Sequence, residues 1–249
     1  MNSWARFLFS FAAAAALTAS VALADGTAPI RHLVYKFDVT LSTTATVHDS
    51  GIGGDGGASG STDYHSGSSD EGTITVDVLQ VQPDTGLVVQ IAEQARNRRD
   101  AVPTECVTYG NGAVVCDQSH GQLNEEEMTL LRFLGRNFIN SALIDAKHHW
   151  QYAANTAESS ETNDYTLGAS KGDTVDIAYQ RLLKVTGANG FNATTDGSMS
   201  YNKTLNMPVS VKEQTLTRRN TGAGNYDTTR QDMTFSLAQD SMQQAAQSH

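Results

Sequence analysis

The stretch that decides the fold is residues 124–135, which read NEEEMTLLRFLG. Its apolar side chains recur at helical spacing, so that Leu130, Leu131 and Leu134 fall on one face. Asn124 and the three Glu after it suit a helix start, because Asn caps free amides and carboxylates favour the positive end of the helix dipole. These features predict one amphipathic helix over residues 124–135.

The opposite face of this helix is polar. Glu126, Thr129 and Arg132 fall on it, and we expect them to face solvent. Gly135 is typical of a helix end. A helix of about three turns is only marginally stable alone in water. Another apolar element must therefore cover its leucine face.

The remaining chain alternates apolar and polar residues with the period of β-strands. The clearest example runs from His32 to Leu41, with Tyr35 and Phe37 on its apolar side. Short gaps rich in turn residues, such as 187–190, leave no room for crossover helices. The sequence therefore predicts a mainly β fold, with a large curved antiparallel meander sheet (a half-barrel or open barrel) and one amphipathic helix covering its apolar face.

The first 24 residues predict a cleaved secretion signal. Arg6 precedes an apolar run, and Ala22-Leu23-Ala24 has the small residues that a signal peptidase requires. Cleavage after Ala24 would leave a secreted or periplasmic chain that does not span a membrane. Residues 25–240 are expected to form a single β-rich domain.

Two segments of the exported chain are predicted to lack regular structure. Residues 49–72 are rich in Gly, Ser and Asp, which is typical of a flexible loop. Whether this loop binds a cation is left open by the sequence, although its Asp63, His65 and Asp70 could collect one. Residues 241–249 are expected to form a disordered C-terminal tail.

Cys106 and Cys116 flank Gly110-Asn111-Gly112. A three-residue loop centred on Asn111 would place the two cysteines opposite each other in a hairpin, within disulfide reach. An exported chain with two cysteines makes oxidation the default. The sequence therefore predicts a Cys106–Cys116 disulfide.

The net charge of the chain is −10, and loss of Arg6 with the signal would bring it to −11. An acidic surface repels phosphate backbones, so nucleic acid is not expected as a partner. Two glycosylation sequons, Asn192-Ala193-Thr194 and Asn202-Lys203-Thr204, matter only in a host that modifies exported chains.

The sequence predicts no catalytic residue, no metal site and no cofactor. It contains no G-x-S-x-G, H-E-x-x-H or P-loop motif. Ser119-His120 is only a dipeptide, whereas a triad needs a third group and an oxyanion site. His148 and His149 are neighbours on a candidate strand, so their side chains point to opposite faces and cannot chelate one ion.

The order of these elements resembles that of exported bacterial half-barrel proteins of the lipoprotein-carrier type. The resemblance rests on the order of strands, a hairpin that carries two cysteines, a helix, and a strand with His149-Trp150-Gln151. A long meander follows, which contains Gly197-Ser198-Met199-Ser200-Tyr201 and Asn206-Met207-Pro208-Val209. It implies a curved antiparallel sheet with helical cover and an apolar concave face. No functional residue carries over from that family.

We therefore expect a non-enzymatic exported binding protein that holds a lipid or other apolar ligand between helix 124–135 and the concave sheet. The alternative is a structural or protein-interaction module of the cell envelope, with an envelope protein as partner; a hydrolase is less favoured. The side chains expected to line the apolar site are Leu130, Leu131, Leu134, Tyr35, Phe37 and Trp150.

Overall fold

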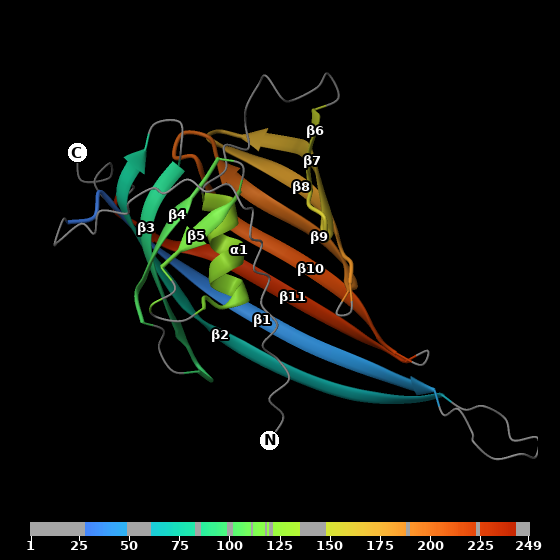
Figure 1. The fold of residues 1–249 in the computed structure, drawn as a ribbon. Coiled ribbons are helices and arrows are strands. Elements are labelled where there is room, and N and C mark those ends of the chain that lie inside the picture. Colours follow the sequence, from blue (N-terminus) through green and yellow to red (C-terminus); the bar gives the residue numbers. More distant parts are fainter. Residues whose placement is uncertain are drawn as a thin grey trace, which may run out of the picture. The chain divides into compact units, whose positions relative to one another are not determined.

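The computed structural model contains one antiparallel sheet of eleven strands, which is not closed, and one helix, α1 (Figure 1). This confirms the predicted fold class of a mainly β protein with one helix. The elements are β1 (Arg31–His48), β2 (Ser61–Gln82), β3 (Gly86–Ala95), β4 (Thr104–Thr108), β5 (Val114–Cys116), α1 (Glu125–Leu134), β6 (His149–Asn155), β7 (Ser159–Lys171), β8 (Thr174–Val185), β9 (Phe191–Asn202), β10 (Met207–Gly222) and β11 (Asn225–Asp240).

The structure describes most of the chain between residues 28 and 242. The predicted secretion signal, residues 1–24, lies outside the described residues. The described ranges are 28–48, 61–82, 86–98, 102–110, 112–117, 119, 122–134, 148–187, 190–222 and 225–242.

The strands follow the order β5-β4-β3-β2-β1-β11-β10-β9-β8-β7-β6 across the sheet. Every pair of neighbours is also consecutive in sequence, except β1 and β11. The chain thus makes the predicted meander in two runs, and its first and last strands lie side by side. Short connections allow this arrangement because antiparallel neighbours need only a turn between them.

The chain divides into two compact units. The first unit comprises Met1–Tyr35, Thr73–Arg136 and Leu237–His249, and the second comprises Lys36–Gly72 and Asn137–Ser236. Both units take residues from β1, β2 and β11. The expectation of a single domain over residues 25–240 stays a prediction.

In the first unit, α1 packs against β3, β4 and β5 (Figure 1). Leu130 and Leu131 are completely buried, as the helical pattern predicts. The helix start is held by a capping interaction, because the Asn124 amide donates to Glu127 Oε2 at 2.9 Å. No helix among the described residues is long and apolar enough to cross a membrane.

The polar face of α1 differs from the prediction. Glu126 and Thr129 were expected to face solvent, but both are buried. The spacing of apolar and polar residues predicts which sides of a helix differ, but it does not show how much of the helix its neighbours cover. The ten-residue helix α1 contacts three strands, so part of its polar side is also buried. The predicted solvent face of α1 is therefore wrong at these two positions.

The predicted disulfide is present. Cys106 on β4 pairs with Cys116 on β5, and their sulfur atoms are bonded. The Gly112 amide donates to the Tyr109 carbonyl at 2.8 Å, which closes the hairpin loop. Asn111, the predicted centre of that loop, lies outside the described residues. The disulfide is compatible with an exported protein.

In the second unit, buried positions alternate with more exposed ones along much of β8 and β9. Three Gln–Asp pairs lie in one cross-strand row of the exposed face, each joined by a hydrogen bond of 2.8 Å. They are Gln151–Asp164, Gln180–Asp196 and Gln214–Asp232. This row confirms the expectation that one face of the sheet is polar.

Two predicted irregular segments are partly ordered. The loop prediction for residues 49–72 is wrong from Ser61 onward, where β2 begins; residues 49–60 lie outside the described part of the chain. A strand that buries few side chains still needs a neighbouring strand for its backbone hydrogen bonds, and Thr46 also donates to Asp63 at 2.7 Å.

At the C-terminus, Ser241 accepts a hydrogen bond from the His32 amide at 3.0 Å. The predicted tail is therefore ordered at Ser241, while residues 243–249 lie outside the described part of the chain.

Candidate functional site

The side chains predicted to line an apolar site are all buried. The three leucines lie on α1 and Tyr35 lies on β1, within the first unit. Phe37, further along β1, and Trp150 on β6 belong to the second unit. That they enclose a ligand stays a prediction. The buried residues are Leu130, Leu131, Leu134, Tyr35, Phe37 and Trp150.

Three aromatic side chains lie side by side on the buried face of the second unit. Trp150, Tyr165 and Tyr179 occupy paired positions on β6, β7 and β8. The rings of Trp150 and Tyr165 stack with centroids 5.3 Å apart, and the Tyr179 ring lies 6.0 Å from that of Tyr165. Such ring pairs attract each other beyond the effect of apolar burial. We call these three residues the aromatic row.

Tyr179 extends the aromatic row over Gly197. A Cβ atom at position 197 would lie 2.1 Å from the Tyr179 ring, so only glycine leaves room for it. Beyond this glycine, the Tyr179 hydroxyl donates to Glu213 Oε2 at 2.9 Å. Burial, and then the nearby Glu213 carboxylate, raises the pKa of Tyr179 well above its usual range. The phenol therefore remains a neutral donor.

The Trp150 indole carries a buried donor without an acceptor. Its residue is 4% exposed, and Nε1 has no hydrogen-bond partner among the residues that the structure describes. An unpaired buried donor costs about 1–3 kcal/mol. A ligand oxygen placed at this nitrogen would remove that cost. The aromatic row thus has a polar atom that can orient a ligand.

The aromatic row separates an apolar row from a polar row on the same face. The apolar row is formed by Leu167, Ile177, Met199, Val211 and Phe235. On the other side of the aromatic row, Asn163 and Thr195 are buried, and Thr195 shares a hydrogen bond of 2.8 Å with Thr215. The buried face of the second unit therefore changes from apolar to polar across the aromatic row.

The first unit holds a different polar group, which we call the carboxylate cluster: Glu93 on β3, Glu126 and Glu127 on α1. Arg98 Nη2 lies 2.9 Å from Glu93 Oε1 and 3.2 Å from Glu126 Oε1. Glu93 Oε2 and Glu127 Oε1 are buried and have no hydrogen-bond partner within the described chain. Arg98 thus contacts two of the three carboxyl groups, those of Glu93 and Glu126.

Burial controls the protonation of the carboxylate cluster. Burial, opposed by Arg98 and reinforced by Glu126 and Glu127, raises the pKa of Glu93 to about 7. Burial also raises the pKa of Glu127, although the Asn124 amide opposes this. Carboxyl groups with such a pKa can act as acids or bases. Here Glu93 is 2% and Glu127 1% exposed, and Arg98 already contacts Glu93 and Glu126.

The sequence did contain a signal for this cluster. Leu87, Val89 and Ile91 alternate along β3, and the same parity leads to Glu93, whose side chain must then face the core. Arg98 belongs to a short basic segment with Arg96 and Arg99 at the end of the β3 pattern, which is typical of a solvated strand end. The structure places it half-buried, between Glu93 and Glu126.

The weaker chemical candidates do not assemble into a site. Ser119 donates to Asp117 at 2.8 Å, and His120 lies outside the described residues. Asp63 lies on β2 and accepts a hydrogen bond from Thr46. Within the described ranges, no three His, Cys, Asp or Glu side chains are grouped so that they could hold a metal ion.

Comparisons with known proteins include a structural similarity to lipovitellin. No family model matches the chain. No curated protein matches it in sequence. A structure from work on lipid–protein interactions in lipovitellin aligns with a TM-score of 0.49 at 7% sequence identity. The alignment covers 86% of this chain and 26% of that chain, so the chain spans about a quarter of the length of the lipovitellin chain.

Proposed function

We propose that this chain is an exported, non-enzymatic binding protein for an amphipathic ligand with an apolar chain, such as a fatty acid or another lipid. The ligand chain packs against the apolar row of the second unit. Its carbonyl or carboxylate accepts a hydrogen bond from the Trp150 indole. The polar row then faces the hydrophilic end of the ligand. The proposal includes no catalytic step.

The observation that carries the proposal is the unpaired Trp150 Nε1 within the aromatic row. Buried donors are paired in most proteins, because an unpaired donor destabilises the fold. Its neighbours Tyr165 and Tyr179 offer ring surface, and the apolar row continues that surface on the adjacent register positions. Binding sites commonly combine an apolar wall with few polar groups that fix the orientation of the ligand.

The test begins with the protein lacking residues 1–24, purified from an oxidising compartment. Native mass spectrometry and lipid extraction should detect a bound lipid, and the delipidated protein should take up a fluorescent fatty acid. Trp150→Phe keeps the aromatic surface but removes the donor, so the fatty acid should bind about tenfold more weakly. Tyr64→Phe, at an exposed aromatic residue, is the matched control and should bind normally.

A protein that is folded, empty after purification and unable to take up any fatty acid would contradict the proposal. So would equal affinity in Trp150→Phe and the original protein. Turnover in an esterase, glycosidase or peptidase screen would contradict the non-enzymatic part.

An interaction module of the cell envelope is the second candidate, and two exposed leucines favour it. Leu182 and Leu216 are 45% and 49% exposed, and both pair with Thr194 on the polar face of the second unit. A photo-crosslinking residue at position 216 should capture one envelope protein, whereas the same residue at position 212, on the same strand and face, should not. Capture of nothing specific at position 216 would contradict this candidate.

A further inference from the structure

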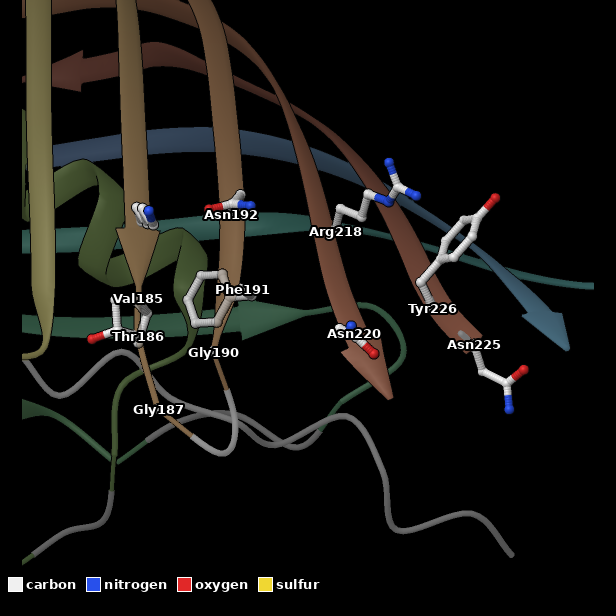
Figure 2. A pocket seen from close by; sticks show the side chains of 11 residues that line it. Val185, Thr186, Gly187, Gly190, Phe191, Asn192, Arg218, Asn220, Asn225 and Tyr226 are labelled. Carbon is white, nitrogen blue, oxygen red and sulfur yellow. The ribbon is translucent and has the colours of Figure 1, made fainter. Parts of the chain in front are cut away.

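A groove of about 610 Å³ opens where two hairpins of the second unit end (Figure 2). The hairpin of β8 and β9 contributes Lys184 and Asn192 to its lining. The hairpin of β10 and β11 contributes Arg218, Asn220 and Tyr226. We call this feature the hairpin groove. It shares no residue with the aromatic row, so it constitutes a separate candidate site.

The strand register brings the polar lining residues together. Asn192 on β9 pairs with Lys184 on one side and with Arg218 on the other, and all three are exposed. Asn220 pairs with Tyr226 on the next register position of the same face. Adjacent strands lie about 4.8 Å apart, so the backbones that carry the two cations are separated by roughly 10 Å. An amide thus lies between two positive charges.

Arg218 is held against an aromatic ring. Its guanidinium carbon lies 4.1 Å from the centroid of the Tyr226 ring. A guanidinium stacked in this way uses its flat face for the ring, which leaves its N–H edge for acceptors in the plane. Figure 2 shows Arg218 and Tyr226 projecting together from the neighbouring strands β10 and β11. The pair offers a ligand both a fixed cation and ring surface.

The charge of the hairpin groove is opposite to that of the whole chain. Lys184 and Arg218 line the groove, and no Asp or Glu is among its lining residues. The chain as a whole has a net charge of −10. Acidic groups elsewhere on the surface repel anions, so a local pair of cations without carboxylates favours an anion at this place. Arginine also matches carboxylate and sulfate groups with paired hydrogen bonds.

We propose that the hairpin groove binds an anionic saccharide, that is, a short oligosaccharide that carries carboxylate or sulfate groups. Lys184 and Arg218 contact the charged groups. The side-chain amides of Asn192 and Asn220 both donate and accept, as sugar hydroxyls require. Tyr226 adds aromatic surface, and the groove volume lies within the range of ligand sites. This proposal is independent of the lipid-binding function.

Isothermal titration calorimetry tests the proposal with an oligogalacturonate and with a sulfated oligosaccharide, each against the protein lacking residues 1–24. The host should not glycosylate proteins, so that the sequon at Asn192 stays unmodified. We expect saturable binding of at least one of these saccharides and none of the neutral maltohexaose. Raising the salt concentration from about 0.05 to 0.5 M should weaken binding, since exposed charges are screened.

Two variants and a control locate the site. Arg218→Gln should weaken binding at least tenfold, whereas Arg218→Lys should have an intermediate effect because it keeps the charge and loses the stacked guanidinium. Lys212→Gln removes an exposed charge from the same strand and face outside the groove, and it should bind normally. Circular dichroism should confirm that each variant is folded.

Four outcomes would overturn the proposal. The first is no binding of either anionic saccharide, and the second is equal affinity of Arg218→Gln and the original protein. Binding of sulfate or phosphate with the same affinity as the saccharides would indicate an anion site only. Binding to anionic phospholipid vesicles but to neither saccharide would indicate a membrane surface instead.

Discussion

The aromatic row and the carboxylate cluster both leave buried polar atoms unpaired, but the two regions respond differently to pH. In the aromatic row, the unpaired group is the neutral indole N–H of Trp150. In the carboxylate cluster, the unpaired oxygens belong to Glu93 and Glu127, which burial converts into weaker acids. A carboxyl group can relieve its burial by taking up a proton, whereas an indole has no such means.

This difference separates a buried donor that only an acceptor can pair from carboxyl groups that a proton can neutralise. The carboxylate cluster is satisfied in part by protonation and by Arg98. The Trp150 N–H can be paired only by an acceptor other than the side chains and backbone groups that the structure describes. The comparison therefore favours the aromatic row over the carboxylate cluster for the ligand site that we propose. Four sets of substitutions test this comparison of the two regions.

The largest effect is expected from Tyr165→Ala. The Tyr165 ring lies between those of Trp150 and Tyr179, and it is 2% exposed. Truncation of a large buried aromatic side chain should lower the free energy of unfolding by about 4 kcal/mol, measured by urea denaturation. The exposed control Tyr64→Ala should change it by less than about 0.5 kcal/mol. Similar values for both variants would mean that the aromatic row is not a packed unit.

Glu93→Gln tests the carboxylate cluster. The pKa of Glu93 is about 7 in the folded protein, against an ordinary value of 4.5. Between these pH values, the folded state keeps a proton that the unfolded chain has released, so the free energy of unfolding falls as the pH rises from about 4.5 to 7. The full effect is roughly 3 kcal/mol.

The Glu93→Gln variant should therefore be more stable than the original protein at pH 8 and similar to it at pH 4.5. Part of the slope should remain, because burial also raises the pKa of Glu127. Urea denaturation across this pH range measures the effect. Equal pH profiles of the two proteins would contradict the assignment of Glu93 as the group that titrates.

Removal of the disulfide should have the next effect. Cys106→Ser with Cys116→Ser opens a short loop in the strands beneath α1, which should lower the free energy of unfolding by about 2.5 kcal/mol. The change acts on the first unit. Emission of Trp150 in the native state, which reports on the second unit, should be unchanged. A shifted native emission would indicate that the two regions depend on each other.

The smallest effect is expected from Trp150→Phe. The substitution keeps a ring in the stack and removes the unpaired donor, so the ligand-free protein should become more stable by about 1 kcal/mol at every pH. This independence of pH distinguishes it from Glu93→Gln. A loss of stability instead would mean that the packing lost with the larger indole outweighs the relief of the unpaired donor.

Much of the second unit could be predicted from the sequence. The alternation in β8 and the turn at residues 187–190 indicate the strand and its end, because a period of two and a glycine-rich turn are local signals. The register is not local. That Trp150 lies opposite Tyr165, and that Gly197 lies beneath Tyr179, depends on pairings between strands that no single segment encodes.

The errors have physical causes too. Residues 61–72 have the composition of a loop, but β2 gains its hydrogen bonds from a neighbouring strand rather than from apolar burial. Glu126 was expected in solvent because a helical pattern shows which residues are polar, but not which of them neighbouring strands bury. The hairpin groove was not predicted, since it requires the ends of two hairpins to lie side by side.

The most direct test of the lipid-binding account uses the emission of Trp150. The chain has two tryptophans, Trp4 and Trp150, so the protein lacking residues 1–24 reports from Trp150 alone. Titration of the delipidated protein with a fatty acid should shift this emission saturably, with the same affinity as the uptake of a fluorescent analogue. Emission that stays constant while the analogue binds would place the ligand away from the aromatic row and contradict the account.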